Sequence, residues 1–465
     1  MGKPVCFFPS NYVGYEITNK NKTDKGLQLE LTRRSSSSFD DVEKLSVSIV
    51  EVDTNTLQVK IGKENGSEPL ALPGRLNLPP RTGQKKDGNQ TYTYSIDNGI
   101  LTIHRKVTGL MIWSANLQTL IFAKQFRQLD TQVPVPALYG LGEHMDHLRK
   151  TDFNFTRYTF SNRGRDPTWM LNSYGTHPMY LIQEPKFGAH FALHLNTYPG
   201  EAILRPGPGI TWRTIGGDFE FTFHLQDSTL NVIASYTKMV GLPFLPPVWS
   251  LGFHLSRFGY DSLNETRATY QRMRDAQIPY DTQWHDIDAM DTFNDFTYDP
   301  INFHGLPDFV QELHNNGMQY VPIVDPGLDG IYLNGSKYPG FNLSAVVRNP
   351  DGSALRAQVW NQNWTVWIDF TSQAGQQLWS NQIASYHGQV HFDGIWIDMN
   401  EPTNLVNGSL DGCLNSTLDH PPYIPGDELD PIYEQTACMS AQHAVGAHYR
   451  VHNTYGHWEA WTTYL

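Results

Sequence analysis

Cysteine is scarce in this chain, which has only three among its 465 residues, at positions 6, 413 and 438. So few thiols exclude a disulfide-rich scaffold and a zinc site built from paired thiolates. Cys413 and Cys438 flank a loop rich in Pro and Gly, and we expect them to pair. Cys6 then has no partner, which in an oxidising compartment favours a further segment upstream.

Long apolar runs and basic runs are also missing. No stretch approaches the roughly 20 residues of a membrane-spanning helix, and residues 1–4 lack the apolar core of a signal peptide. The 34 Lys and Arg residues stand against 47 Asp and Glu, for a formal charge of −13. The sequence therefore predicts no membrane span and no nucleic-acid partner. It leaves the oligomeric state open.

Ten Asn-X-Ser/Thr acceptors for N-linked glycans point to a compartment. Any one of them arises easily by chance, but their density favours a chain made in the secretory pathway, for the lysosome or the cell surface. Its leader would then lie outside this sequence. The acceptors are Asn21, Asn65, Asn89, Asn154, Asn264, Asn334, Asn342, Asn363, Asn407 and Asn415.

Length and composition predict at least two domains. From about Gly26 to Thr237, short alternating apolar runs separated by Gly, Pro and Asn turns predict an antiparallel β-sandwich. After the Pro-rich segment 241–247, strand-like runs alternate with helix-like stretches, which predicts a parallel sheet. The expected divisions are residues 1–25, 26–243 and 244–465.

About four βα units fit after residue 243. The predicted strands are 249–254, 281–286, 320–325 and 394–398, and the predicted helices are 264–277, 306–315 and 372–386. A (β/α)8 barrel needs eight strands. We therefore expect residues 244–465 to form about the first half of a barrel, with the chain ending inside this domain.

Three predicted strands end in aspartate, at Asp286, Asp325 and Asp398. In a barrel, the carboxyl ends of the strands converge on one face. Carboxylates gathered there suit a divalent cation, sugar hydroxyls, or the roles of acid, base and nucleophile.

Tryptophans near the same strand ends help to choose among these uses. A single Trp in an apolar run is more often a core residue. Their clustering with carboxylates favours carbohydrate, because flat aromatic rings suit the apolar faces of pyranose sugars. The tryptophans are Trp284, Trp360, Trp364, Trp367 and Trp396.

The segment Gly394-Ile-Trp-Ile-Asp-Met-Asn-Glu-Pro402 resembles the signature of the glycoside hydrolase family 31 α-glucosidases. The resemblance runs nearly end to end, through segments 139–144, 212–217, 252–257, 323–326 and 452–456. Residues 6–9 resemble the last cysteine stretch of the trefoil module that precedes the sandwich in animal members. The family implies an N-terminal sandwich followed by a barrel, with residues 1–25 a trefoil remnant and linker.

The resemblance implies exo-acting, retaining cleavage of terminal α-1,4-linked glucose from maltose-like oligosaccharides or glycogen, with no metal or organic cofactor. Asp398 matches the catalytic nucleophile and Glu401 the carboxylate that supports it. Asp286 matches the residue that hydrogen-bonds the hydroxyls of the terminal glucose. Other walls of that subsite match Ile287, Ile323, Asp325, Trp360, Trp396 and Met399.

Three departures from the family pattern affect these expectations. Phe258 replaces a Trp, and Gly164 replaces a substrate-contacting Asp, for which Asp166 is a nearby substitute or simply a turn former before Pro167. No segment matches the family's general acid/base. We therefore expect little turnover from this chain alone, and an acid/base Asp about 100 residues beyond Asp398 in a longer reading frame.

Two other functional classes remain open. One is a noncatalytic protein that binds carbohydrate or a partner protein. The other is a related enzyme, namely an α-xylosidase, a transglucosidase or the catalytic subunit of endoplasmic-reticulum glucosidase, although the trefoil remnant disfavours the last.

Overall fold

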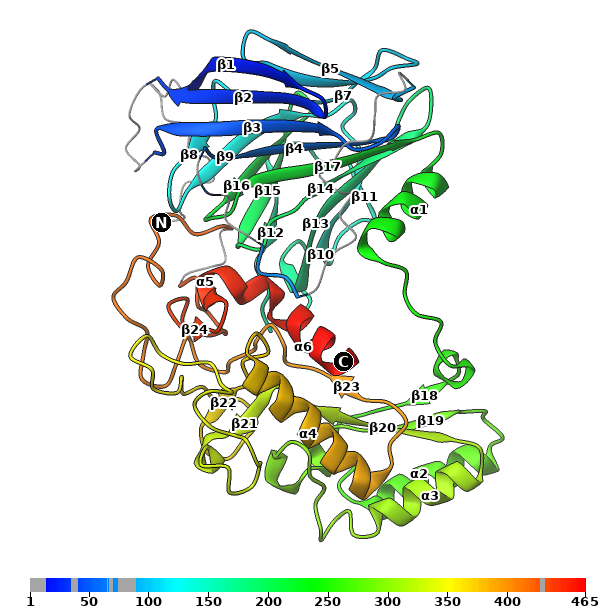
Figure 1. The fold of residues 1–465 in the computed structure, drawn as a ribbon. Coiled ribbons are helices and arrows are strands. Elements are labelled where there is room, and N and C mark those ends of the chain that lie inside the picture. The colour runs from blue at the N-terminus through cyan, green and yellow to red at the C-terminus, as the bar shows by residue number, and fades with distance from the viewer. Residues whose placement is uncertain are drawn as a thin grey trace. The chain divides into compact units, whose positions relative to one another are not determined.

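The structure is a computed structural model that describes residues 14–34, 41–64, 66, 70–73, 89–164, 166–426 and 431–465. It divides into two compact units (Figure 1). The first unit holds the described residues up to Leu242 with those of segments 415–432 and 449–454, and the second holds the remainder from Pro243 onward. The predictions for Cys6 and Asn65 fall outside the described residues.

Two antiparallel sheets form the first unit. The nine-stranded sheet has the order β1-β2-β3-β4-β17-β14-β13-β10-β11. Its strands are β1 (Tyr15–Thr23), β2 (Gly26–Arg33), β3 (Lys44–Glu51), β4 (Thr56–Lys63), β17 (Phe219–Gln226), β14 (Ala189–His194), β13 (Asn172–Gln183), β10 (Leu138–His144) and β11 (Arg149–Lys150).

The eight-stranded sheet has the order β12-β15-β16-β9-β7-β6-β5, with β8 paired to β9. Its strands are β5 (Tyr92–Asp97), β6 (Ile100–Arg105), β7 (Met111–Asn116), β8 (Ile121–Phe122), β9 (Arg127–Gln132), β12 (Thr156–Phe160), β15 (Gly200–Arg205) and β16 (Gly209–Thr214). These two sheets confirm the prediction of an antiparallel N-terminal region. Strand β1 covers most of the described part of residues 1–25 and pairs with β2 along its length.

Alternating apolar positions give the two sheets a shared core. In β3, Val47 and Ile49 are buried while their neighbours are partly exposed. Trp113 of the eight-stranded sheet packs against Phe221 and Phe223 of the nine-stranded sheet, with ring centroids 5.6 and 5.1 Å apart. Outside this core, helix α1 (Thr229–Val240) packs on strands β14 and β17.

Parallel strands alternating with helices form the second unit. Its sheet has the order β18-β19-β20-β23, and each neighbouring pair is parallel. The strands are β18 (His254–Leu255), β19 (Thr282–His285), β20 (Gln319–Val324) and β23 (Trp396–Ile397), and the helices between them are α2 (Leu263–Asp275), α3 (Leu306–Asn315) and α4 (Gln373–Val390). The predicted βα alternation is confirmed, whereas the half barrel stays a prediction.

Shorter elements complete this part of the chain. They are β21 (Gly327–Asp329), β22 (Thr365–Trp367), β24 (Gln442–His443), β25 (Gly446–Ala447), α5 (His448–Val451) and α6 (Tyr455–Tyr464). Among the described residues, every helix is too short or too polar to cross a membrane.

The strand predicted at 249–254 is wrong in most of its length. A 3-10 turn occupies Val248–Leu251, and the strand covers only His254–Leu255. The backbone N–H of Ser250 donates to the carbonyl of Pro247 at 3.0 Å. A chain that hydrogen-bonds to itself three residues back cannot pair as a strand there, so its apolar residues were not evidence of one.

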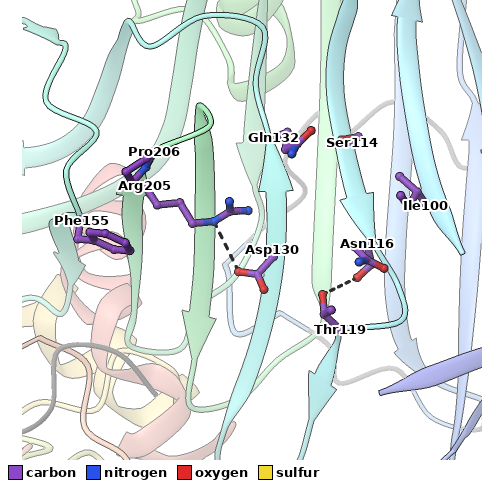
Figure 2. Close-up of a pocket in the computed structure, with 9 residues that line it drawn as sticks. All are labelled: Ile100, Ser114, Asn116, Thr119, Asp130, Gln132, Phe155, Arg205 and Pro206. Carbon is purple, nitrogen blue, oxygen red and sulfur yellow. Dashed lines mark hydrogen bonds and ion pairs between the residues drawn. The ribbon is translucent and has the colours of Figure 1, made fainter. Parts of the chain in front are cut away.

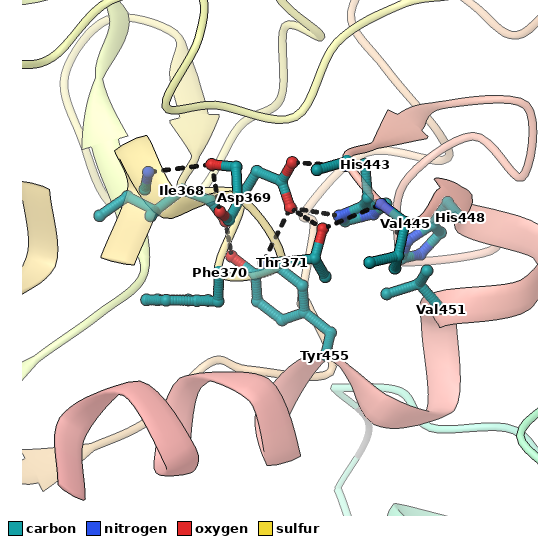
Figure 3. Close-up of polar contacts among 12 residues, drawn as sticks. Ile368, Asp369, Phe370, Thr371, His443, Val445, His448, Val451 and Tyr455 are labelled. Atoms are coloured by element: carbon teal, nitrogen blue, oxygen red, sulfur yellow. Dashed lines mark hydrogen bonds and ion pairs between the residues drawn. The ribbon is translucent and has the colours of Figure 1, made fainter. Parts of the chain in front are cut away.

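A buried Asp-His-His chain of hydrogen bonds fixes the β24–β25 hairpin (Figure 3). Asp369 Oδ1 lies 3.3 Å from Nδ1 of His443, and Nε2 of His443 lies 3.0 Å from Nδ1 of His448. Asp369 also accepts hydrogen bonds from the Thr371 hydroxyl and the Ala444 backbone N–H. Burial opposes the charge on Asp369, but the contacts with His443, Thr371 and Ala444 together outweigh it and hold the pKa of the carboxyl below its usual range. A charged Asp369 therefore anchors the hairpin.

Candidate active site

The register of the parallel strands brings three predicted site residues to one end of the sheet. The last residues of β20 and β23 pair with each other, so Asp325 and Asp398 come next on adjacent strands. The last residue of β19 pairs with Pro322 of β20, and Asp286 follows it. Neighbouring strands lie about 4.8 Å apart. The three carboxyl groups therefore share the carboxyl end of the sheet, as a parallel arrangement requires.

Asp325 is the most buried of the three, with 4% of its surface exposed. Its backbone N–H donates to Oδ1 of Asp295 at 2.6 Å. Burial raises the pKa of Asp325 well above its usual range, and the charge of Asp295 raises it further. Burial also raises the pKa of Asp295 to about 8. The pair consequently holds at least one proton at neutral pH.

Asp286 and Asp398 are only partly buried. Burial raises the pKa of Asp286, and the charge of Asp398 adds to this effect. The backbone N–H of Ile287, 2.6 Å from Oδ1 of Asp286, opposes the shift without reversing it. The influence of Asp398 on Asp286 indicates that the two carboxylates are close in space.

An apolar wall stands beside these carboxyls. Ile287, Met290 and Ile323 form a small buried cluster, and Trp396 packs against it. The ring of Trp284 lies 5.6 Å from that of Trp396, centroid to centroid. The structure thus gathers Ile287, Ile323 and Trp396, which were predicted to line one subsite. A wall of this kind can cover one face of a sugar ring.

The chain turns sharply after Asp398. Met399 has a φ of +59°, a left-handed conformation that few non-glycine residues adopt. Glu401 lies two residues after Met399, has 7% of its surface exposed, and accepts a hydrogen bond from the Thr403 hydroxyl. A second, buried carboxyl, that of Glu401, therefore lies three residues after Asp398, just beyond the turn.

The remaining predicted site residues are more exposed. Phe258 follows β18 and is 61% exposed, and Trp360 is 40% exposed in the loop before β22. Asp166 is exposed and belongs to the first unit, whereas Asp398 belongs to the second. The roles of Phe258, Trp360 and Asp166 stay predictions.

Two buried carboxyls near the site were not predicted, Asp295 and Glu459. Glu459 lies in α6 and is fully buried. Burial raises its pKa well above the usual range, and nearby carboxylates that include Asp398 raise it further. A signal for Glu459 existed, because it is the sole Asp, Glu, Lys or Arg in an aromatic stretch that contains Trp458 and Trp461. Asp295 follows an Asn and has the pattern of an ordinary turn.

His285, directly before Asp286, is also fully buried. Its Nδ1 lies 3.0 Å from the Tyr320 hydroxyl and its Nε2 lies 2.9 Å from the Thr266 hydroxyl. Burial lowers the pKa of His285 from 6.5 to about 3. The unfolded chain takes up this proton near pH 6.5 and the folded chain does not. The stabilisation is therefore complete above pH 6.5 and is lost as the pH falls toward 3.

We expect His285→Gln to weaken the acid sensitivity of the free energy of unfolding. Between about pH 7 and pH 4.5, the buried imidazole should account for a loss of about 3 kcal/mol, which the variant lacks. Denaturant unfolding at both pH values measures the difference. His304→Gln, at an exposed histidine, should retain the acid sensitivity of the parent chain. If His285→Gln behaves like this control, the buried imidazole is not the cause.

The second unit contains a disulfide. Cys413 and Cys438 are joined by an S–S bond of 2.04 Å, with Cα atoms 5.4 Å apart. This confirms the predicted pairing. The loop that the disulfide closes includes segment 415–432, which belongs to the first unit.

All the described acceptor asparagines are exposed. For the chain made in a secretory cell, we expect amidase removal of N-linked glycans in ¹⁸O-water to leave labelled Asp at several of these positions, as detected by peptide mass spectrometry. Asn342 and Asn363 should have low occupancy, because the side-chain amide of each already donates a hydrogen bond, to the Gly340 carbonyl at 3.0 Å and to Asp329 at 2.9 Å. The chain made in bacteria supplies the control. A secreted chain with no labelled site would contradict the expectation.

Residues 243–465 match the family model described as the glycosyl hydrolases family 31 TIM-barrel domain. These residues belong to glycosyl hydrolase family 31. The family 31 region contains the whole parallel sheet and the three aspartates at its strand ends.

Curated relatives align with almost the entire chain. Lysosomal alpha-glucosidase of Mus musculus is 36% identical over 464 residues, which cover 99% of this chain and 48% of the relative. Intestinal sucrase-isomaltase of Homo sapiens is 33% identical over 471 residues, which cover 98% of this chain and 25% of the relative. The chain thus spans about half the length of the lysosomal relative.

Two solved structures share the fold. The alpha subunit of glucosidase II, in a form bound to alpha3-Glc2, aligns with a TM-score of 0.77 at 17% identity and covers 98% of this chain and 56% of that one. An alpha-xylosidase from a soil metagenome aligns with a TM-score of 0.64 at 13% identity, over 96% of this chain and 63% of that one. At such identities the similarity concerns the fold alone.

Proposed function

We propose that this chain belongs to a retaining α-glucosidase that releases terminal glucose from α-1,4-linked oligosaccharides or glycogen. One observation carries the proposal: Asp286, Asp325 and Asp398 meet at the carboxyl end of the parallel sheet, beside an apolar wall, within the family 31 region. Catalytic groups of barrel enzymes lie at this end of the strands. The curated relatives named alpha-glucosidase support the choice of substrate class.

Asp398 is the proposed nucleophile. Asp325 is almost fully buried and its carboxyl has a strongly raised pKa, so it is a poor source of a reactive carboxylate. One oxygen of Asp286 is occupied by the Ile287 N–H, which suits it for holding a sugar hydroxyl with the other. Asp398 is the partly exposed carboxyl that remains. Its attack on the anomeric carbon forms a C1–O ester and expels the leaving oxygen.

Glu401 is proposed to support the nucleophile, and Ile287, Ile323, Trp396 and Met399 to surround the terminal glucose. The retaining reaction also needs a carboxyl that protonates the leaving group. None of Asp286, Asp325 and Glu401 takes that role in this proposal. No metal or organic cofactor takes part.

We also propose a secretory-pathway location, lysosomal or at the cell surface, which the exposed glycan acceptors and the disulfide support.

A suitable test examines the nucleophile separately from the acid. A glucosyl fluoride with a second fluorine on its ring loses fluoride with little protonation, so its first step needs only a nucleophile and a pocket. The C1–F bond breaks, a bond from C1 to a carboxylate oxygen forms, and fluoride departs. Peptide mass spectrometry of the treated chain then locates the ester.

An ester on Asp398 is the expected result. An ester on another carboxyl would overturn the assignment of the nucleophile. A chain that binds glucosides but forms no ester would be a noncatalytic saccharide-binding protein, and the enzymatic proposal would fail. Faster labelling by the corresponding xylosyl fluoride would identify an α-xylosidase instead.

A further inference from the structure

The outer face of the eight-stranded sheet carries a pocket of about 460 Å³ that the proposed active site does not use. Side chains of β7, β9 and β15 form its floor, and all its lining residues belong to the first unit. In Figure 2, Phe155 stands at one side and Ile100 at the other, with polar side chains between them. The pocket thus combines two apolar edges with a polar base.

Strand alternation explains the polar base. Trp113 and Leu129 point into the shared core, so the next residues along their strands, Ser114 and Asp130, point outward. Ser114 of β7 lies opposite Gln132 of β9, which adds a side-chain amide to the same face. Adjacent rungs of two strands therefore supply hydroxyl, amide and carboxylate groups to one surface.

Arg205 is held flat over this surface. Its Nη2 donates to the Thr131 carbonyl at 2.9 Å and its Nε donates to the Thr211 hydroxyl at 3.0 Å. The lack of a side chain at Gly209 makes this possible, because a Cβ there would lie 2.7 Å from Cζ of Arg205. Nε also lies 3.8 Å from Oδ1 of Asp130. The guanidinium is therefore positioned, and its charge is balanced by a carboxylate.

Hydrogen-bonding capacity is left over at the pocket. Within the described part of the chain, the Gln132 amide and the Ser114 hydroxyl make no hydrogen bond. Asn116 uses Oδ1 to accept from the Gln118 N–H at 3.0 Å, which leaves its amide N–H groups available.

One apolar edge of the pocket is formed by Phe155, which is 42% exposed. Its φ of +62° is a costly conformation for an aromatic residue.

We propose that this pocket binds a neutral pyranose saccharide, separately from the active site. A pyranose offers hydroxyls to the amides and the ion pair, and an apolar face to the Phe155 ring. An anion gains little here because Asp130 balances the charge of Arg205. An apolar ligand would leave the Gln132 amide without a partner. Binding at this pocket needs no hydrolysis and does not depend on Asp398.

Such a saccharide has two candidate sources. One is a free α-glucan chain, the substrate class proposed above. The other is the core of an N-linked glycan on Asn154, the neighbour of Phe155 in the sequence and itself exposed. Maltotriose represents the first source and N,N′-diacetylchitobiose the second.

Fluorine NMR can report on the pocket alone. The full chain carries Asp398→Asn to prevent turnover, is made without glycans, and has a fluorinated phenylalanine at position 155. A second sample carries the label at Phe187, which is also 42% exposed but does not line the pocket. We expect maltotriose to shift the signal at position 155 saturably and to leave the signal at 187 unchanged. Gln132→Ala should weaken the apparent affinity by about five- to tenfold.

A response to the chitobiose probe alone would support the saccharide class and identify the chain's own glycan as the occupant. The proposal is overturned if neither saccharide shifts the signal at 155, if 155 and 187 respond alike, or if glucose 6-phosphate binds better than the neutral sugars. Labelling of Asp398 is measured independently, so failure of this pocket and failure of the proposed enzyme are distinguishable.

Discussion

Asp398→Asn is expected to slow ester formation by the glucosyl fluoride by about a thousandfold or more. The amide keeps the size of the side chain but has no anionic oxygen to form the bond to C1. Rates of label incorporation, followed by intact-protein mass spectrometry in the parent and variant chains, measure the effect. Because the leaving group is fluoride, the result concerns the nucleophile and does not depend on which residue is the acid.

Asp393→Asn is the matched control. Asp393 precedes β23 whereas Asp398 follows it, so the two substitutions lie at opposite ends of one short strand. The Asp393 carboxylate accepts from the Tyr320 N–H at 2.9 Å and contacts His314 at 2.8 Å, and an Asn oxygen can keep both contacts. Its labelling rate should stay close to that of the parent. Equal losses in the two variants would mean that damage to the strand explains both.

A second readout separates chemistry from folding. The charge of Asp398 contributes to the raised pKa of Asp286. Asp398→Asn should therefore lower the pKa of Asp286 toward its ordinary value, which carboxyl NMR titration of a folded variant would detect. An unchanged titration of Asp286 would show that the two side chains are not neighbours.

The sequence predicted those parts of the molecule that depend on local pattern. Period-two alternation in segments such as β3 predicted strands with one buried face, and the alternation of strands and helices after residue 243 predicted a parallel sheet. Aspartates at three strand ends were enough to predict that their carboxyls would meet, because parallel strands share one carboxyl end.

What the sequence did not predict depends on contacts between distant residues. Asp295 joins the site by accepting a hydrogen bond from the backbone N–H of Asp325, 30 residues away, and no local sequence pattern marks it. The contact between Glu201 and Tyr423 spans 222 residues. The strand predicted at 249–254 failed for a different reason, since apolar residues after Pro247 suit a turn as well as a strand.

Glu201→Ala is expected to destabilise the first unit by about 3–5 kcal/mol. Glu201 is buried in β15, on the same outer face as the proposed saccharide pocket. Its carboxylate lies 3.2 Å from Arg213 and 3.2 Å from Arg157, and it accepts hydrogen bonds from the Tyr423 hydroxyl and the Gly426 N–H. Removing it leaves a buried Arg213 without its carboxylate and takes two anchors from segment 415–432. Denaturant unfolding measures the loss.

Limited proteolysis tests whether Glu201 anchors segment 415–432. If Glu201 holds the segment on the sheet, Glu201→Ala should increase cleavage around Tyr423 under conditions that leave the sheet strands intact. Glu16→Ala is the control, since Glu16 and Arg34 form an exposed ion pair at 3.7 Å that should be worth less than about 1 kcal/mol. Glu201→Gln keeps the shape of the side chain and one acceptor oxygen, so its loss of stability should lie between those of Glu16→Ala and Glu201→Ala. A small loss in Glu201→Ala, similar to that of the control, would mean that the buried arginines find other partners and that the segment is held by the packing of Tyr423 against Phe126, whose ring centroids are 4.9 Å apart.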